Sequence, residues 1–463
     1  MNEAPNSLTS RREFIKTTGR LAAVSALAGV ALPHVHAEGK EMIQVGLVGC
    51  GGRGSGAADN AISNKMIPAK LVAMADVFDK KMASSYDGLK NKGKDHVDVP
   101  EDRKFIGFDG YMKVMDALKP GDVVILTTPL AFRWVHFNYA IQKGLNVFME
   151  KPLTSDGPTS RRILKLSEDA KAKNLKVGVG LMSRHKRGMQ ELHARIQDGE
   201  IGDIIMMRGY RMQGPLATAF STKWPGDPSE LLWQISRFHS FIWASGGCFN
   251  DFYIHHIDHL CWMKNAWPVK AQALGGRNYR TDPDGKPYVD QNFDSYSVEY
   301  TFADGSKMFM DGRCMNGCND IYSSYAHGSK GMAIVAKSGD YNGPCMSFKG
   351  QNPQRSNMIW SSKAVENDDN PYVNEWNDLM EAIRDNKPYN EVSNGIAASV
   401  TSSMGRLAAH TAQEITYDEF LNSEHEYAPG VDKLTMNSPA PVTAGPDGKY
   451  PGPMPGITTK TDY

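Results

Sequence analysis

The stretch from residue 42 to residue 62 constrains the fold of this chain more than any other part of its sequence. It begins with an apolar, β-branched run, residues 42–48, which is typical of a buried parallel strand. The turn that follows has the pattern G-x-G-x-x-G, and residues 55–62 then have the spacing of a helix. The turn consists of Gly49, Cys50, Gly51, Gly52, Arg53 and Gly54.

Glycines in this pattern allow a tight turn, a close approach of the backbone to a pyrophosphate, and close packing of the helix on the sheet. The pyrophosphate would lie at the helix N-terminus, where unpaired N–H groups favour an anion. The run 71–75 ends at Asp76, at the distance expected for a ligand of a ribose 2′-hydroxyl. We therefore predict an NAD site. Arg53 leaves NADP open, and the alternative is a glycine-rich turn without a ligand, with Asp76 capping a helix.

Further strands alternate with helices after this unit. Residues 122–127, 146–149 and 176–180 are apolar runs, and residues 136–143 have helical spacing. This alternation predicts a doubly wound parallel sheet, in which ligands bind at the carboxyl ends of the strands. The residues expected to reach the cofactor from these elements are Thr128, Pro129, His136, Glu150 and Lys151.

A second group of polar residues follows Gly246-Gly247. If this stretch is helical, Asp251, His255 and either Asp258 or His259 share one face. Each of these residues has an ordinary explanation when taken alone. An Asp and a His one turn apart are usually a hydrogen-bonded pair, and a lysine before a proline, such as Lys151, is usually a solvated loop residue. Asp251, His255 and His259 could bind a divalent metal, but no further ligand motif supports one, so we expect none.

Taken together and in this order, these motifs resemble the Gfo/Idh/MocA family. The resemblance extends from about residue 42 to residue 423. The residues that carry it are Gly49-x-Gly51-x-x-Gly54, Asp76, Glu150-Lys151-Pro152, Gly246-Gly247, Asp251-x-x-x-His255-x-x-Asp258, Asn374–Leu379, Lys387–Glu391 and Met404-Gly405-Arg406. The family implies an NAD(P)-dependent oxidoreductase that moves hydride between a sugar or polyol carbon and a nicotinamide. It also implies an α/β fold, with an N-terminal Rossmann domain, a C-terminal α+β domain built on a large, mostly antiparallel sheet, and a homo-oligomer.

The resemblance also implies roles for individual residues. His255 would be the general acid/base, which suits an imidazole that exchanges protons near neutrality. Asp251 would hold the substrate hydroxyl, and Lys151 would stabilise negative charge on the reacting oxygen. The residues expected on the substrate side are Arg184, His185, Tyr253 and Asp258. Tyr253 departs from the family, which often has a small residue at this position, and its phenol is expected to reshape the pocket or add a hydroxyl to it.

Three other functions compete with this interpretation. A redox-neutral, NAD-dependent glycosidase would work through a 3-keto sugar and would need no external acceptor. A sugar-binding protein without catalysis is a second possibility, but Lys151, Asp251 and His255 argue against it. A metal-dependent lyase or hydrolase using the histidines is a third. Lysines and arginines balance aspartates and glutamates at 52 each, so charge gives no reason to expect a nucleic-acid partner.

The first 37 residues are predicted to be an export signal. Arg11-Arg12 precedes an apolar run, residues 21–32, which is too short for a convincing membrane span. The paired arginines resemble a twin-arginine signal, which implies export of a folded protein to the periplasm with its cofactor tightly bound. A basic amphipathic extension is the alternative. We expect no stable membrane insertion, and the six cysteines are expected to be free thiols or to form at most one disulfide.

The remaining chain is predicted to form two domains and a tail. The NAD-binding domain covers residues 38–155 and the substrate-binding domain residues 156–428. The strands expected in the second domain are 203–211, 269–274, 294–302, 307–313 and 332–337, and residues 374–412 are expected to be mostly helical. The Pro- and Gly-rich tail, residues 429–463, is expected to wrap around the domain or to remain flexible.

Overall fold

A computed structural model describes residues 42–362 and 369–463, so the predicted export signal lies outside the described residues. The N-terminal part forms a six-stranded, fully parallel sheet of order β3-β2-β1-β4-β5-β6. Its strands are β1 (Ile43–Val48), β2 (Ala69–Asp76), β3 (Lys104–Ile106), β4 (Val123–Leu126), β5 (Asn146–Met149) and β6 (Val177–Val179). This is the doubly wound sheet that the sequence predicts.

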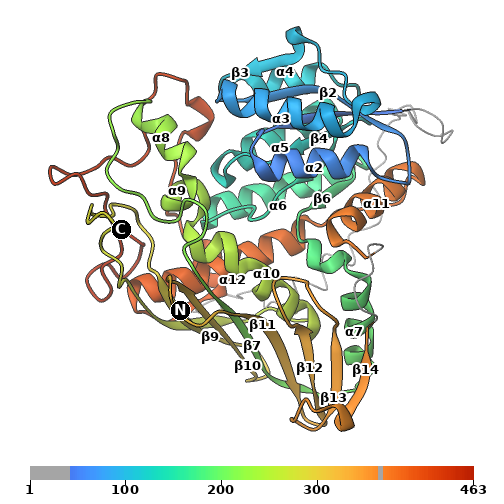
Figure 1. The fold of residues 1–463 in the computed structure, drawn as a ribbon, viewed down its shortest axis with the longest axis vertical. Helices are drawn as coiled ribbons and strands as arrows, with labels where there is room; N and C mark the ends of the chain where they lie inside the picture. The colour runs from blue at the N-terminus through green and yellow to red at the C-terminus, as the bar shows by residue number, and fades with distance from the viewer. Residues whose placement is uncertain (1–41, 363–368) are drawn as a thin grey trace, which may run out of the picture. The chain divides into compact units, whose positions relative to one another are not determined.

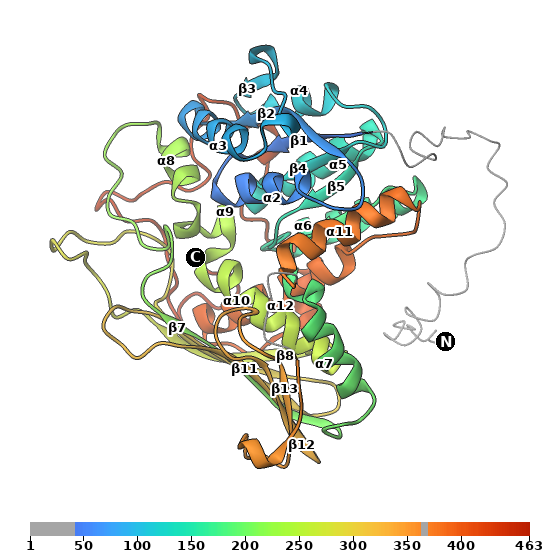
Figure 2. The ribbon, with the colours of Figure 1, turned by 45° about the vertical axis from the view of Figure 1, so that its right-hand side comes forward.

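Helices cover both faces of this sheet, which explains why its strands are almost continuously apolar. Successive side chains of β1 point to opposite faces, so Val45 and Leu47 pack in one core and Val48 in the other. Figure 2 shows α2, α3 and α11 on one face of the sheet. The helices around the sheet are α2 (Gly52–Ile62), α3 (Asp79–Lys92), α4 (Gly110–Asp116), α5 (Arg133–Lys143), α6 (Gly157–Ala172) and α11 (Pro371–Arg384).

The second sheet has nine strands in the order β14-β13-β12-β11-β7-β10-β9-β8-β15. Only β7 and β10 pair in parallel, so the sheet is mostly antiparallel, as predicted. Its strands are β7 (Ile204–Gln213), β8 (Lys270–Gly276), β9 (Ser295–Thr301), β10 (Lys307–Cys314), β11 (Ile321–Gly328), β12 (Gly331–Ala336), β13 (Met346–Lys349), β14 (Met358–Ser361) and β15 (Ile415–Thr416).

The five strands predicted for this region are all present, and the four that sequence analysis missed have weak signals. β11 mixes polar residues with only a few large side chains and lacks apolar alternation, and β13, β14 and β15 have four residues or fewer. Short strands give too few residues for a period of two to stand out.

Two long helices lie side by side on one face of the second sheet (Figure 1). They are α10 (Gly247–Lys264) and α12 (Val392–Thr411), and nearly all residues of both are buried. α12 is rich in Ala, Ser and Gly, which lets its neighbours approach closely. A Cβ at Gly405 would lie 2.0 Å from the Tyr300 hydroxyl. α10 therefore has a fixed position, and it carries Asp251 and His255.

Other helices complete the chain. They are α7 (Arg187–Gln197), α8 (Glu230–Ser236), α9 (Ile242–Ser245) and α13 (Tyr417–Asn422). Within the described ranges, no helix has both the length and the apolar character that crossing a membrane requires.

The parallel sheet does not end at the predicted domain boundary after residue 155. β6 pairs with β5 beyond that boundary, and α11, from the predicted second domain, packs on the first sheet through Trp376 against Phe148, with ring centroids 4.6 Å apart. A boundary drawn from sequence order misses such a return of the chain, because packing depends on apolar surface and not on position in the sequence.

The C-terminal tail packs against the fold, which is the first of its two predicted behaviours. Val442 and Tyr450 are buried with α8 and α9, and Asp462 is completely buried. The Gln234 side-chain amide donates to the Val442 carbonyl over 2.7 Å. The tail thus packs against the fold even though it has few apolar residues, because a few of its side chains, such as Tyr450 and Asp462, are buried.

Candidate active site

The glycine-rich turn has the geometry that a dinucleotide requires. Gly49 has φ +97°, a conformation that favours glycine, and a Cβ there would lie 2.8 Å from the backbone of Thr127. A Cβ at Gly54 would lie 2.0 Å from the Gly49 carbonyl oxygen, so only glycine lets the helix approach the turn this closely. The Thr127 hydroxyl donates to the same carbonyl over 2.6 Å and ties the turn to the end of β4.

The N-terminus of α2 is open toward a cavity. Its N-cap residue is Gly51, which has no side chain to cap the helix, and the first turn contains no acidic residue. A Cβ added at Gly51 or Gly52 would meet nothing within 4 Å. Unpaired N–H groups facing empty space at a helix N-terminus form a site for an anion such as a diphosphate.

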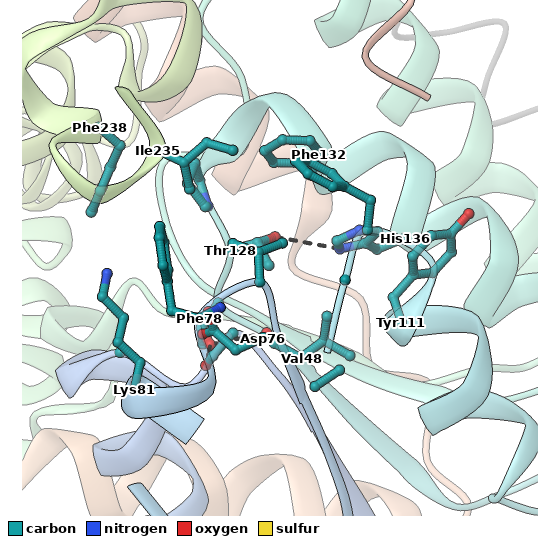
Figure 3. Close-up of a pocket in the computed structure, with 18 residues that line it drawn as sticks. Val48, Asp76, Phe78, Lys81, Tyr111, Thr128, Phe132, His136, Ile235 and Phe238 are labelled. Carbon is teal, nitrogen blue, oxygen red and sulfur yellow. Dashed lines mark hydrogen bonds between the residues drawn. The ribbon is translucent and has the colours of Figure 1, made fainter. Parts of the chain in front are cut away.

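Asp76 lies at the end of β2, where its carboxylate is fixed by the backbone. It accepts hydrogen bonds from the N–H groups of Cys50, at 2.6 Å, and Phe78, at 2.9 Å. Asp76 lines a narrow slot of about 100 Å³, together with Phe78, Lys81, Phe108 and Phe238. Figure 3 shows this slot between the end of β2 and the segment around Ile235. A carboxylate beside apolar rings suits the ribose and adenine of a dinucleotide.

His136 lies in the wall of this slot. Its ring stacks on Tyr111 with centroids 4.3 Å apart, and its Nδ1 lies 3.3 Å from the Thr128 hydroxyl (Figure 3). Burial and then the nearby Arg133 lower the pKa of His136 to about 3, so the ring is neutral. The slot wall therefore has aromatic character rather than positive charge at this point.

A larger cavity of about 430 Å³ adjoins the slot. Gly51, Thr128, Pro129 and Phe238 line both, so the two spaces follow one edge of the parallel sheet. The predicted residues that line the larger cavity are Gly51, Gly52, Arg53, Gly54, Thr128, Pro129, Glu150, Lys151, Asp251 and His255. The structure thus brings the glycine-rich turn and the three predicted catalytic residues into one space.

The three predicted catalytic residues are close to one another. The Lys151 ammonium donates to the Asp251 backbone carbonyl over 2.7 Å and lies 3.8 Å from its carboxylate. Burial acts to raise the pKa of Asp251, but Lys151 and His239 outweigh it and lower this pKa to about 2. Burial lowers the pKa of His255 to about 3. At neutral pH the site therefore combines the carboxylate of Asp251 with the neutral imidazole of His255, and Lys151 lies beside them.

Arg53 is paired with acidic residues and does not line the slot that contains Asp76. Its Nε lies 2.6 Å from a Glu150 carboxylate oxygen, and its guanidinium lies 4.5 Å above the Tyr372 ring. Arg53 is the residue for which the sequence left NADP open. Because it is paired with Glu150 and lines the larger cavity, whereas Asp76 lines the slot, it no longer gives a reason to expect NADP. Lys81 lines the slot together with Asp76, and sequence analysis did not single it out.

None of the four residues predicted on the substrate side lines the cavity. Tyr253 is two residues from Asp251, so the helical period turns it to the opposite side of α10. Its hydroxyl lies 3.5 Å from the Cys314 sulfur in the core, so it neither reshapes the pocket nor adds a hydroxyl to it.

Asp258 is fully buried and binds the Arg184 guanidinium at 2.7 Å. These two residues form an ion pair that holds α10 to the segment after β6.

His185, the fourth of these residues, follows β6 and lies between the carboxylates of Asp378 and Glu391. Its Nδ1 lies 2.7 Å from Asp378 and its Nε2 lies 3.0 Å from Glu391. Burial alone lowers the pKa of His185, but these acidic partners outweigh it and raise this pKa to about 10. The imidazolium is therefore paired with two carboxylates and does not line the larger cavity.

This ion cluster predicts a pH-dependent stability. Because the folded-state pKa of about 10 is above the ordinary value of 6.5, the contribution of His185 is complete below pH 6.5 and is lost as the pH rises toward 10. In urea unfolding, the difference in unfolding free energy between the wild type and His185→Gln should be largest near pH 6 and should decrease toward pH 10. His327→Gln, on β11, is the control. A difference that stays constant with pH would contradict the charged state of His185.

Sequence analysis missed several residues that line the larger cavity. His239 lies 3.3 Å from the Asp251 carboxylate, and its Nδ1 lies 2.8 Å from the Thr218 hydroxyl. Arg211 comes from β7, and Asp340 from the loop after β12. No local motif surrounds these residues, and only the packing of α10 between the two sheets brings them to the cavity.

The other histidines of α10 face its packed side. His259 Nε2 lies 2.7 Å from the Ser324 hydroxyl, and His256 stacks on Tyr322 with centroids 5.0 Å apart. Across residues 42–362 and 369–463, no group of three His, Cys, Asp or Glu side chains has the arrangement of a metal site.

Comparison with known proteins finds a family model that matches part of this chain. Residues 189–334, which include all of α10, the strands β7 to β11 and most of β12, match the GFO/IDH/MocA C-terminal domain. An inositol 2-dehydrogenase of Corynebacterium glutamicum is 27% identical over 169 residues, which are 36% of this chain. The chain thus spans 44% of the length of this curated relative.

Solved structures have the same fold over most of the chain. A myo-inositol 2-dehydrogenase from Lactobacillus plantarum has a TM-score of 0.58 at 20% identity, over 81% of this chain and 99% of that protein. Levoglucosan dehydrogenase in complex with NADH and levoglucosan has a TM-score of 0.61 at 17% identity, over 81% of this chain and all of that protein. At these identities the similarity establishes the architecture, an α/β sheet followed by a large second sheet.

Proposed function

We propose that this protein is an NAD-dependent oxidoreductase of the Gfo/Idh/MocA family that oxidises a CH–OH group of a sugar or polyol. The observation that carries the proposal is that Lys151, Asp251 and His255 line the same cavity as the open N-terminus of α2. A catalytic base, an ammonium and a dinucleotide cradle in one space are what hydride transfer from an alcohol requires. The match of residues 189–334 to the family's C-terminal domain supports it.

The residues of the cavity fit NAD. The diphosphate would contact the N–H groups at Gly51 and Gly52, and the adenosine ribose would contact Asp76. The bound cofactor supplies a nicotinamide that accepts hydride from the carbon being oxidised. Asp76 would repel a 2′-phosphate, and Arg53 is already paired with Glu150, so we favour NAD over NADP.

The chain's own residues handle the proton and the negative charge. The neutral His255 accepts the hydroxyl proton, and Asp340 and Asp251 favour the protonated ring and offset part of the opposing effect of burial, Lys151 and Arg211. The ammonium of Lys151 stabilises negative charge on the oxygen as the proton leaves. One carboxylate oxygen of Asp251 is paired with His239, and the other faces Lys151 and the cavity.

The proposal is tested by cofactor release and by turnover. The purified protein is denatured and the released nicotinamide is measured. The native protein is then incubated with a panel of neutral monosaccharides, cyclitols and glycosides with NAD or NADP. We expect NADH formation with at least one polyol and slower reduction of NADP. A protein that binds no nicotinamide would contradict the proposal. Release of an aglycone without net NADH would instead favour the redox-neutral glycosidase.

We also propose an exported homo-oligomer with a tightly held cofactor. The paired arginines Arg11-Arg12 and the apolar run after them support export by the twin-arginine pathway. Ile205 and Leu274, on strands of the second sheet, are 56% and 79% exposed, which supports a contact between copies of the chain. The segment around Phe238 lines both the slot and the larger cavity, which supports slow release of a bound dinucleotide.

A further inference from the structure

The larger cavity contains a second pair of charged residues, neither of which is proposed to contact the reacting atoms. Arg211 lies on β7 and Asp340 lies in the loop between β12 and β13, so they come from different strands of the second sheet. Arg211 Nη1 lies 3.1 Å from an Asp340 carboxylate oxygen. Both residues line the cavity together with His255. The pair is therefore beside the proposed catalytic base.

The protein holds Arg211 in one orientation. Its Nη1 also donates to the Phe252 carbonyl over 2.8 Å, and its guanidinium lies 4.5 Å from the centre of the Tyr322 ring. The side chain is 10% exposed, so it loses little further freedom when a ligand binds. Such a preorganised guanidinium reduces the entropy cost of recognition.

Arg211 still has hydrogen-bonding capacity that the described residues do not use. Its Nη2 makes no hydrogen bond to any residue within 42–362 or 369–463, whereas its Nε is buried and out of reach of a ligand. A guanidinium has five N–H donors, and a carboxylate has about four acceptor positions. A ligand oxygen that accepts from Nη2 therefore satisfies a donor that the described residues leave unpaired, and gains affinity and specificity.

The charges of the pair indicate which ligand fits. Burial acts against the charge of Asp340, but His255, Arg211 and His256 outweigh it and lower the pKa of this carboxyl below its ordinary value. The carboxylate and the guanidinium therefore neutralise each other. A donor and an acceptor side by side match two neighbouring hydroxyl groups, each of which both donates and accepts hydrogen bonds. An anionic group would gain from Arg211 but would be repelled by Asp340.

We propose that Arg211 and Asp340 form a specificity subsite that binds two neighbouring hydroxyl groups of a neutral sugar or cyclitol ring, next to the carbon that is oxidised. The inference rests on the proposed function for the identity of the reacting carbon. The subsite selects neutral vicinal diols over uronic acids and over deoxy sugars that lack one of the two hydroxyls. Phe252, which also lines the cavity, offers an apolar ring for the C–H face of such a substrate.

The test compares two variants with two substrates. Asp340→Asn and Arg211→Lys are assayed with the best neutral polyol from the panel and with its deoxy analogue. For the full polyol we expect KM to rise about 10- to 100-fold in both variants, since each variant removes a bond made to both ground and transition states. The kcat of Arg211→Lys should change by only a few fold, and that of Asp340→Asn should fall further, because Asp340 also favours protonated His255. For the deoxy analogue the wild type should already be weakened, and the variants should add less than about threefold.

Direct binding to the NAD-loaded protein, measured by calorimetry or ligand-observed NMR, gives a readout that is independent of turnover. Arg208→Lys is the matched control, because Arg208 is an exposed arginine of the same strand that does not line the cavity. Thermal unfolding of each variant checks its fold.

Equal losses for the full polyol and the deoxy analogue would overturn the subsite, as would unchanged binding in both variants. If Asp340→Asn fails to fold, Arg211→Lys decides alone. A wild type that binds the polyol without forming NADH would overturn the proposed function and leave the subsite supported. A wild type that binds uronic acids more tightly than neutral polyols would overturn the subsite alone.

Discussion

The His255→Asn variant is expected to lose about 10²- to 10⁴-fold in kcat for polyol oxidation, which is the usual contribution of a positioned acid or base. Asparagine preserves much of the shape of the side chain but cannot accept the hydroxyl proton. Because His255 lines the larger cavity and not the slot that contains Asp76, NAD should bind to the variant as it does to the wild type. Steady-state kinetics and a titration of NAD binding measure the two effects.

A matched histidine distinguishes this role from a general effect of substitution. His193 lies on α7, stacks on Trp262 with ring centroids 4.9 Å apart, and lines neither cavity. His193→Asn should therefore retain kcat within a few fold. Full activity of His255→Asn would refute its role as the base, and loss of NAD binding would mean that the residue supports the site rather than the chemistry.

The second large effect is expected at the C-terminus, where Asp462→Asn should lower the unfolding free energy by about 3–5 kcal/mol. The Asp462 carboxylate lies 3.0 Å from Arg406 Nε and 2.6 Å from His410 Nδ1, and it also accepts a hydrogen bond from the Tyr427 hydroxyl. Asp462, Arg406 and His410 are all inaccessible to solvent. Removing the carboxylate leaves the buried guanidinium uncompensated, and this cost dominates the effect.

Urea unfolding at pH 7 measures this effect, and another acidic residue of the tail provides the control. Asp447 is exposed, so Asp447→Asn should change the unfolding free energy by less than about 0.5 kcal/mol. An effect of Asp462→Asn as small as that of the control would mean that the tail does not stabilise the fold. A change in the slope of the unfolding curve would indicate that the tail unfolds separately.

The structure brings together the residues that the sequence proposed for catalysis, but not those that it proposed for the substrate side. Lys151, Asp251 and His255 belong to local motifs, and the structure brings all three to one cavity. The residues predicted on the substrate side instead lie in the core or in ion pairs, because polarity alone does not distinguish a ligand from a buried structural partner. Arg184 and Asp258 illustrate this, since each is the other's partner.

The sequence by itself determined the features that depend on neighbours along the chain. The positive φ of Gly49, the open helix start at Gly51 and the strand periods follow from local sterics and hydrophobic spacing. The tertiary structure alone decided which distant residues meet. Arg211 and Asp340 are 129 residues apart, and Asp462 is 52 residues from His410. Such pairs have no local signal, because their contact depends on the burial of whole sheets and helices against one another.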